Sequence, residues 1–225
     1  MFSAAFSLKK RGRLGVKERQ EREREAVARA ILDAARELFV AEGYQNVSIR
    51  KIAEKIEYSP AAIYGYFESK DDIFLALAEE GFRMLFATGH EPPAVDPIER
   101  VRAGFLRLYE FSKKHPEYYA LMFLDRSVPP ISNDWQRFGF VREMKGRFAA
   151  HIQSVIDAGL LHRDTKADAA FRILMAAIHG VAAIRLCGRL GPREDADALA
   201  RDTLEAALTG LRTGIAHTFH PEPCE

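Results

Sequence analysis

The chain has 225 residues and a formal net charge of +1, with 48% hydrophobic and 29% charged residues. This composition is typical of a soluble globular protein and excludes a disordered or fibrous chain. No uninterrupted apolar stretch of about 18–20 residues is present, as a membrane span would need, and the first residues lack the pattern of a secretory signal. We therefore expect a cytoplasmic protein with no membrane contact.

The positive charge lies in the N-terminal part of the chain. Residues 1–70 contain 14 Lys and Arg against 10 Asp and Glu, and the remaining residues contain 19 against 22, which gives +4 and −3. A basic end carried on a faintly acidic body is typical of proteins that face nucleic acid.

Apolar residues recur at helical spacing through nearly the whole chain, and the sequence therefore predicts an all-α fold. The first helix is expected from about 26 to 42, with Val27, Ile31 and Leu38 on its buried face. Gly43 follows it, at a position that suits a left-handed C-cap.

Two short helices with strong start signals follow. Ser48 is placed to cap a helix of about two turns whose inward residues include Ile52. Ser59 and Pro60 then form an N-cap with proline at the first helical position, which starts a third helix ending near Tyr66. Two short helices joined by a turn of about three residues are typical of a helix-turn-helix that enters the DNA major groove.

Ser69 is placed to cap a fourth helix that continues to the proline-rich segment 91–97. Five further helices are expected, at about 97–114, 116–126, 133–158, 166–188 and 195–217, which makes nine in all. We predict five parts: a flexible basic arm at 1–22, a DNA-binding domain at 23–70, a connecting helix at 71–90, a ligand-binding and dimerisation domain at 91–218, and a tail at 219–225.

Residues 26–82 closely resemble the DNA-binding domain of the TetR family of transcriptional regulators. The matching residues are Ala30 to Ala35, Leu38-Phe39, Glu42-Gly43-Tyr44, Val47 to Ala53, Ser59, Ile63 to Phe67 and Ser69 to Ile73. The resemblance implies a dimeric regulator that binds double-stranded DNA, most commonly a repressor released from a roughly palindromic operator by a small molecule. It implies no enzymatic activity and no cofactor.

The candidate DNA-binding residues follow from the resemblance and from helix chemistry. Serine hydroxyls and free N–H groups at helix starts bind phosphate, and Arg50 is the best candidate for reading guanine, because a guanidinium can bond O6 and N7 together. The full set is Ser48, Arg50, Lys51, Ser59, Pro60, Ala61, Ala62, Tyr64, Gly65, Tyr66 and Lys70. As an alternative, each serine only caps its helix, Tyr64 belongs partly to the core and Arg50 is only a solvated charge.

Three features depart from the family pattern. Glu57 stands at a turn position that is usually glycine, and we expect it to adopt a left-handed conformation at some cost. Ala61 and Ala62 replace a Gly followed by Thr or Ser, and position 65 is Gly. Base recognition should therefore depend on methyl contacts, on Arg50 and on DNA shape.

The basic stretch before the domain has two open interpretations. Residues 9–24 are rich in Lys and Arg, with Glu18, Glu21 and Glu23 interleaved. The stretch either follows DNA phosphates as an arm or forms a solvated tail with a helical extension held by intrahelical ion pairs.

The C-terminal part resembles the family only in general layout. Its first half is dense in aromatic residues, which suit an apolar effector cavity with a few polar groups, although most of them can equally be core. His179 is a polar group inside an apolar helical run, and is either a satisfied core or interface histidine or a ligand contact. The candidate pocket residues are Phe105, Tyr109, Tyr119, Met122, Phe123, Trp135, Phe138, Met144, Phe148, Met175 and His179. We expect the effector to be small and largely apolar or aromatic.

Small and apolar residues on the last two helices predict a homodimer, because small side chains allow helices to approach closely. The resemblance implies a two-fold four-helix interface and operator half-sites about 34–36 Å apart, or a multiple of this. The candidate interface residues are Ile173, Ala177, Val181, Leu199, Thr203, Ala206, Ala207, Gly210 and Leu211.

The two cysteines, Cys187 and Cys224, are too few for a disulfide framework, and we expect reduced thiols. His217, His220 and Cys224 have a spacing that suits a metal, but a disordered tail explains them more simply, and we predict no metal site.

The rival functions are an enzyme and a helical scaffold. The sequence has no Gly-rich phosphate loop, HExxH or GxSxG motif to support an enzyme. A dimeric protein-binding scaffold or an activator with altered DNA binding is the alternative that Ala61, Ala62 and Gly65 suggest.

Overall fold

In the computed structural model we describe residues 15–87, 96–134, 136–214 and 218–219, and these form helices and loops without any strand. The all-α prediction is thereby confirmed, with nine α-helices and three short 3-10 or π segments in the described residues. The α-helices are α1 (Val16–Glu42), α2 (Ile49–Lys55), α3 (Pro60–Ile63), α4 (Lys70–Ala87), α5 (Pro97–Lys114), α6 (Pro116–Tyr119), α7 (Gly139–Asp157), α8 (Ala167–Leu186) and α9 (Ala196–Thr213).

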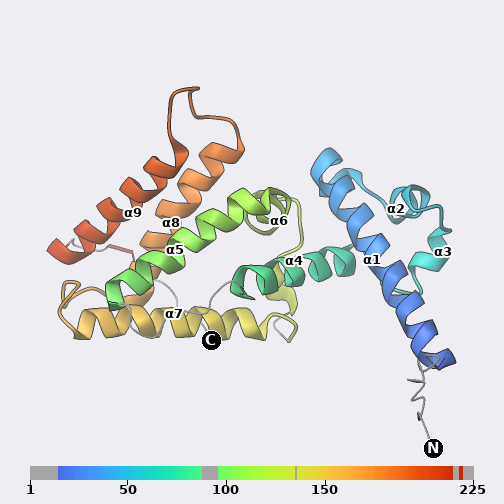
Figure 1. Ribbon diagram of the computed structural model, residues 1–225, viewed down its shortest axis with the longest axis horizontal. Helices are drawn as coiled ribbons and strands as arrows, with labels where there is room; N and C mark the ends of the chain where they lie inside the picture. Colours follow the sequence, from blue (N-terminus) through green and yellow to red (C-terminus); the bar gives the residue numbers. More distant parts are fainter. Residues whose placement is uncertain (1–14, 88–95, 135, 215–217, 220–225) are drawn as a thin grey trace, which may run out of the picture.

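The helices form a small unit and a larger one, joined by α4 (Figure 1). Helices α1, α2 and α3 lie together at one end of the molecule, and α4 runs from them into the body formed by α5 to α9. Helices α8 and α9 pack side by side at the opposite end. The core is continuous through both units, because the buried residues of α1 and α4 connect with those of α5 to α9.

The first helix differs from its prediction at the N-terminal end. It begins at Val16 rather than near 26, and Gly15 N–H donates to the Glu18 carboxylate at 3.0 Å. Residues 17–26 are exposed and bury no apolar face, so apolar periodicity could not reveal this extension. Intrahelical pairs such as Arg19–Glu23, at 3.7 Å, help to hold it.

The first helix ends as predicted, before Gly43. Gly43 has a φ of 80°, which favours glycine, and the Gly43 N–H donates to Phe39 O at 2.9 Å. The accompanying ψ of 146° is more extended than the left-handed C-cap that the sequence suggested. A short 3-10 helix, Tyr44–Asn46, then leads to α2.

Other helix boundaries also differ from the predictions. The segment predicted as one helix at 116–126 divides into α6 and a π-helical turn, Ala120–Leu124. The helix predicted from 133 starts only at Gly139, after a 3-10 helix, Ile131–Asp134. The last helix ends at Thr213 rather than 217, where Gly214 has a φ of 85°. Local periodicity cannot locate such breaks, because π and 3-10 turns keep apolar residues at similar spacing.

Helix α8 is at the centre of the C-terminal body. It packs against α5, α7 and α9. By length and composition alone it is long and apolar enough to cross a membrane, but a core helix of a globular protein has the same character.

Candidate nucleic-acid interface and effector region

The two short helices α2 and α3 are capped as the sequence predicts. Ser48 Oγ accepts from Lys51 N–H at 3.2 Å, and Ser59 Oγ accepts from Ala62 N–H at 3.2 Å. Pro60 occupies the first turn of α3. In these caps each hydroxyl oxygen accepts one hydrogen bond, so its O–H group can still donate to a phosphate.

The turn between the two helices contains the predicted strained residue. Glu57 has a φ of 59°, which is the left-handed region that favours glycine. Tyr58 N–H donates to Ala53 O at 2.9 Å, which closes the turn. The prediction for Glu57 is confirmed, and the side chain itself is exposed.

The inward faces of α2 and α3 are fully buried. Ile52, Ala53 and Ile63 each have 0% exposure, and they belong to the same core as Ile31 of α1. The opposite face is consequently held in a fixed orientation. The predicted DNA-facing residues that are exposed are Ser48, Arg50, Lys51, Ser59, Pro60, Ala61, Tyr64 and Gly65, while Ala62, Tyr66 and Lys70 are half-buried.

Arg50 and Tyr64 are the most prominent side chains of this face. Tyr64 is 57% exposed. Arg50 Nε donates to Glu54 Oε1 at 2.8 Å, and this pairing raises the pKa of Arg50. An exposed pair of this kind is weak, so the guanidinium can exchange Glu54 for another acceptor.

The two lysines of the predicted site have partners inside the unit. Lys51 Nζ pairs with the Glu42 carboxylate and donates to Asn46 O at 3.1 Å. Lys70 Nζ donates to Tyr44 O at 2.9 Å and lies 4.1 Å from the centre of the Tyr44 ring. Both lysines therefore contribute to the structure, whatever they do toward DNA.

Arg24 is a residue that the sequence analysis did not single out. Its Nη2 donates to Gly65 O at 2.9 Å, and its guanidinium lies 5.0 Å from the centre of the Tyr66 ring. Arg24 belongs to α1, so it joins the helical extension to the residues that directly follow α3, the expected recognition helix. The only signal in the sequence was its place in a basic stretch.

The predicted effector residues separate into two aromatic groups. Tyr119, Phe123 and His179 form the first, with ring centres 4.8–5.5 Å apart. Phe105 and Phe148 form the second, with ring centres 5.0 Å apart. The remaining predicted residues in the described part lie as follows: Tyr109 and Phe138 are buried, and Met122, Met144 and Met175 are half-buried; Trp135 lies outside the described residues.

Four phenylalanines that were not predicted join these groups. Phe82 of α4 packs against both Phe123 and Phe138, with ring centres 5.7 and 6.1 Å apart. Phe86 and Phe140 extend this contact, and Phe171 completes the second group. Their helical spacing marked them only as candidate core.

His179 is the polar centre of the first group. The Tyr119 hydroxyl and His179 Nδ1 share a hydrogen bond. Burial lowers the pKa of His179 and raises that of Tyr119. The pair is therefore neutral near pH 7 and able to offer a hydrogen bond to an uncharged molecule.

The hydroxyl of Tyr109 has a structural partner on another helix. It donates to Asp197 Oδ1 at 2.8 Å, which joins α5 to α9. Burial and this carboxylate raise the pKa of Tyr109 to about 12. The Tyr109 hydroxyl is therefore already engaged by α9, and whether the ring of Tyr109 lines an effector pocket stays a prediction.

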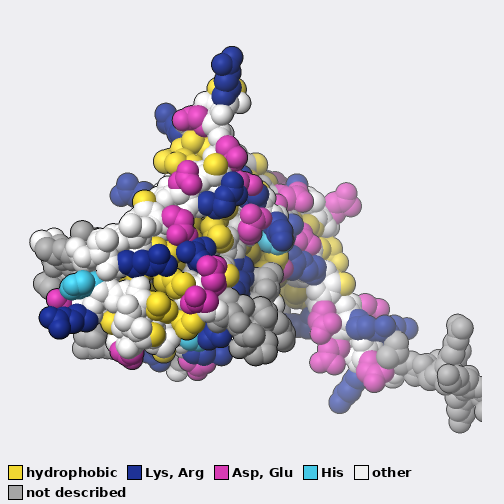
Figure 2. All heavy atoms as spheres, turned by 60° about the vertical axis from the view of Figure 1, so that its left-hand side comes forward, with side chains coloured by type: hydrophobic (Ala, Val, Ile, Leu, Met, Phe, Trp, Pro, Cys, Tyr) yellow, Lys and Arg dark blue, Asp and Glu magenta, His cyan; other side chains and the backbone are white. Residues whose placement is uncertain are grey.

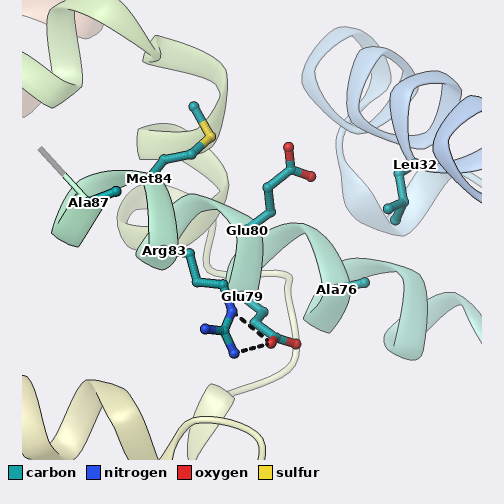
Figure 3. A pocket seen from close by; sticks show the side chains of 7 residues that line it. All are labelled: Leu32, Ala76, Glu79, Glu80, Arg83, Met84 and Ala87. Carbon is teal, nitrogen blue, oxygen red and sulfur yellow. Dashed lines mark hydrogen bonds and ion pairs between the residues drawn. The ribbon is translucent and has the colours of Figure 1, made fainter. Parts of the chain in front are cut away.

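A shallow hollow of about 440 Å³ lies along α4, outside the aromatic groups (Figure 3). Its lining consists of Leu32 of α1 and six residues of α4, Ala76, Glu79, Glu80, Arg83, Met84 and Ala87. Its carboxylates are already paired, Glu80 with Arg29 at 2.7 Å and Glu79 with Arg83 at 2.8 Å. None of the predicted effector residues lines this hollow.

The predicted dimer residues lie on helices that pack against each other within the chain. Val181 and Leu211 are buried there, at 3% and 0% exposure, so they face the protomer's own core rather than a partner. Leu199 and Ala206 are exposed, and Ile184 is exposed beside the predicted set. Figure 2 turns this end of the molecule forward and shows hydrophobic side chains among charges of both signs. Ile173, Ala177, Thr203, Ala207 and Gly210 are half-buried.

The cysteine and histidine predictions have a partial outcome. Cys187 is a free, exposed thiol. His217, His220 and Cys224 lie outside the described residues, and within the described ranges no group of three His, Cys, Asp or Glu side chains is arranged to hold a metal ion.

The sequence matches two family descriptions in succession. Residues 31–77 match "Bacterial regulatory proteins, tetR family", and residues 101–207 match "Tetracyclin repressor-like, C-terminal domain". The chain belongs to the TetR family. It is thus a transcriptional regulator of the helix-turn-helix type, and the family is one of regulators rather than enzymes.

Among curated relatives of this TetR-family regulator is the transcriptional repressor KstR of Rhodococcus jostii, 28% identical over 103 residues. That match covers 44% of this chain and 49% of KstR. The repressor AcnR of Corynebacterium diphtheriae is 40% identical over 50 residues, which covers 22% of this chain and 26% of AcnR. The chain spans at most about half the length of these relatives.

Solved structures of TetR-type regulators share the fold over nearly their whole length. The fatty acid degradation regulator FadR of Bacillus halodurans has a TM-score of 0.64 at 17% identity, over 89% of this chain and 99% of that chain. PfmR of Thermus thermophilus has a TM-score of 0.64 at 23% identity, over 80% and 98%. At these identities the likeness concerns the fold alone.

Proposed function

We propose that this TetR-family regulator binds a roughly palindromic operator as a homodimer and acts as a repressor in the bacterial cytoplasm. The observation that carries the proposal is the outward face of α2 and α3, where capped helix starts stand beside exposed Arg50 and Tyr64. Free N–H groups at helix starts and serine hydroxyls suit phosphates, and the guanidinium suits a guanine edge.

Base recognition by this face depends on few side chains. Ala61 and Gly65 carry no hydrogen-bonding group, so we assign sequence discrimination mainly to Arg50, with methyl contacts from the alanines and stacking or phosphate contacts from Tyr64. Lys51 and Lys70 would contact phosphate only by sharing or exchanging their present partners, Glu42 and Tyr44.

The experiment is selection of genomic DNA fragments by the purified full chain, followed by gel-shift titration. The wild type should enrich fragments with two similar half-sites. Arg50→Ala should relax the preference at one base pair of each half-site by about tenfold, from the 1–3 kcal/mol of a bidentate contact. Arg163→Ala is the matched control, because Arg163 is 90% exposed in the α7–α8 connection. Absence of any enriched fragment would refute the proposal.

We propose further that a small, largely apolar or aromatic effector binds at the aromatic group around His179. The Tyr119–His179 pair supplies hydrogen-bonding groups beside the rings of Phe82, Phe123 and Phe138, and the charge of Arg185 also acts on Tyr119. Because burial keeps the imidazole neutral, an uncharged molecule with one hydrogen-bonding group fits this site better than a carboxylate.

A thermal-shift screen of uncharged aromatic and aliphatic compounds tests this second step. Compounds that raise the unfolding temperature should also weaken operator binding, and His179→Asn and Phe123→Ala should remove the thermal shift. The effector hypothesis fails if compounds that bind at this group leave operator affinity unchanged, because a ligand shifts an equilibrium only by its preference for one state.

A further inference from the structure

The segment before α7 crosses α4 and joins it by a double hydrogen bond. Arg137 Nε donates to Glu79 Oε2 at 2.8 Å, and Arg137 Nη1 donates to Asp72 Oδ1 at 2.9 Å. Asp72 lies in the first turn of α4, and Glu79 lies two turns further along. One guanidinium therefore holds the first half of α4, directly after the DNA-binding unit.

The ion pairs of Arg137 are partly shielded from water. The side chains of Arg137, Glu79 and Asp72 are 24%, 25% and 35% exposed. Burial by itself would raise the pKa of Glu79, but hydrogen bonds from Arg137 and Arg83 outweigh it and lower that pKa. Charge-assisted bonds in such a setting are screened less than surface pairs and hold a defined geometry.

The next residue in the chain connects this joint to the aromatic group. Phe138 is 0% exposed and packs edge-on against Phe82, with ring centres 6.1 Å apart. Phe82 in turn packs against Phe123, which lies beside His179. A molecule that displaces these rings must move residues 137 and 138 together, because they are adjacent in the chain.

Two other hydrogen bonds join the DNA-binding unit to the body, while α4 also packs against the body through Phe82 and Arg83, which contact aromatic rings. Arg36 of α1 donates to the Tyr118 hydroxyl at 3.0 Å, and Gln45 donates to Ser127 O at 2.8 Å. Neither involves α4. In Figure 3, Glu79 and Arg83 extend from α4 on the side away from Glu80, and Arg83 pairs with Glu79 within the helix. Arg137 alone, among the described ion pairs, ties α4 to the segment before α7.

We propose that Arg137 is a positioning residue that fixes the direction of α4, and thereby the spacing of the two recognition helices in the dimer. This inference rests on the proposed function. Its physical basis is that α4 runs directly from the DNA-binding unit, so a small change in its direction is enlarged at α3. An effector would act by moving Phe138 and weakening the bonds of Arg137.

The first test compares operators of different half-site spacing. Wild-type dimer and Arg137→Gln are titrated with a selected operator and with the same operator lengthened by one base pair at its centre. Wild type should discriminate between them, and Arg137→Gln should discriminate at least about fivefold less, at the lower end of measured couplings between sites. Arg137→Lys keeps the positive charge but cannot bond both carboxylates as the planar guanidinium does. Its discrimination between the two operators should lie between those of wild type and Arg137→Gln.

Arg126→Gln is the matched control. Arg126 lies in the same connecting segment, is exposed and has no ion pair among the described residues, so its loss removes one charge without loosening α4. If Arg137→Gln does not fold, Asp72→Asn and Glu79→Gln test the same two bonds from the α4 side. Unchanged spacing discrimination in the folded variants would overturn the inference.

A second measurement does not depend on DNA. Amide hydrogen exchange should rise in residues 72–79 of Arg137→Gln but not of Arg126→Gln, because the first turns of α4 lose the two hydrogen bonds that Arg137 donates to Asp72 and Glu79. Equal exchange in both variants would overturn the inference even if no operator is found. If the wild type selects no DNA, the proposed function is refuted, but the exchange measurement still tests the role of Arg137.

Discussion

At the scale of single residues, Glu57 shows how a functional motif tolerates local strain. Its φ of 59° places it where a residue with a Cβ costs about 1 kcal/mol or more. The turn nevertheless closes, with Tyr58 N–H bonded to Ala53 O. The burial of Ile52 and Ile63 on either side supplies the constraint that maintains it.

We predict that Glu57→Gly stabilises the protein by about 0.5–1 kcal/mol, since glycine relieves the backbone strain but loses more entropy on folding. Chemical denaturation would measure this change. Glu57→Ala removes the same side chain but keeps the Cβ, and should leave stability unchanged. A gain of the same size from alanine would show that the carboxylate, not the backbone, is responsible.

Arg24 joins the helical extension to the recognition helix, and its loss should weaken operator binding. We expect Arg24→Gln to reduce affinity by about fivefold, the equivalent of ~1 kcal/mol for a charge-assisted bond. Arg22→Gln removes an equal charge from an exposed neighbour in α1 and is the control. Equal losses of affinity in gel-shift titrations of both variants would mean that only charge matters.

His179 gives the protein a specific sensitivity to acid. Burial lowers its pKa below the ordinary value of 6.5, so as the pH falls through 6.5 the unfolded chain takes up a proton before the folded one. The stability due to neutral His179 is therefore complete above pH 6.5 and is lost as the pH falls toward the lowered pKa. His179→Asn should lose less unfolding temperature than wild type between pH 7.5 and 5.5. Identical losses in both proteins would contradict this.

At the scale of helices, two helices can lie close together where a glycine of one faces an aromatic ring of the other. A Cβ on Gly104 of α5 would lie 2.3 Å from two ring carbons of Phe148 of α7. That ring is also enclosed by Phe105 and Phe171, at 5.0 and 6.0 Å. The spacing of α5 and α7 therefore depends on a missing side chain.

Gly104→Ala should accordingly destabilise the protein by about 1–3 kcal/mol, as overpacking of a core does. Gly146→Ala, in α7, is the control because nothing lies within 4 Å of its Cβ position. That change should stabilise by about 0.5–1 kcal/mol through helix propensity. A stabilising Gly104→Ala, measured by the same denaturation, would show that the Phe148 ring can move aside freely.

At the scale of the whole molecule, the proposed dimer would bring two DNA-binding faces together. The exposed part of the predicted interface is Leu199 and Ala206 on α9, and Ile184 of α8, which was not predicted, is exposed as well. A buried charge without a partner is strongly unfavourable at such a face. Oligomeric state is therefore sensitive to a single substitution there.

We predict that Ala206→Glu converts the dimer to a monomer at micromolar concentration, measured by light scattering after size-exclusion chromatography. Ala150→Glu places the same charge on an exposed position of α7 and should remain dimeric. If the Ala206→Glu variant remained dimeric, α9 would not be part of the dimer interface.

The sequence by itself determined the features that depend on near neighbours in the chain. The all-α fold, the caps at Ser48 and Ser59 and the left-handed Glu57 were predicted because caps, turns and amphipathic faces span only three or four residues. The same local character explains the error at Val16, since an extension without a buried face leaves no periodic signal.

Only the tertiary structure decided which side chains meet across the molecule. Tyr119 and His179 are 60 residues apart in the chain, and Arg137 lies 58 and 65 residues from its two carboxylates. It also joined Tyr109 to Asp197 of α9 and turned Val181 and Leu211 inward. Periodicity shows that a face is buried, but the partner it is buried against is set by how helices pack, and this depends on the whole chain at once.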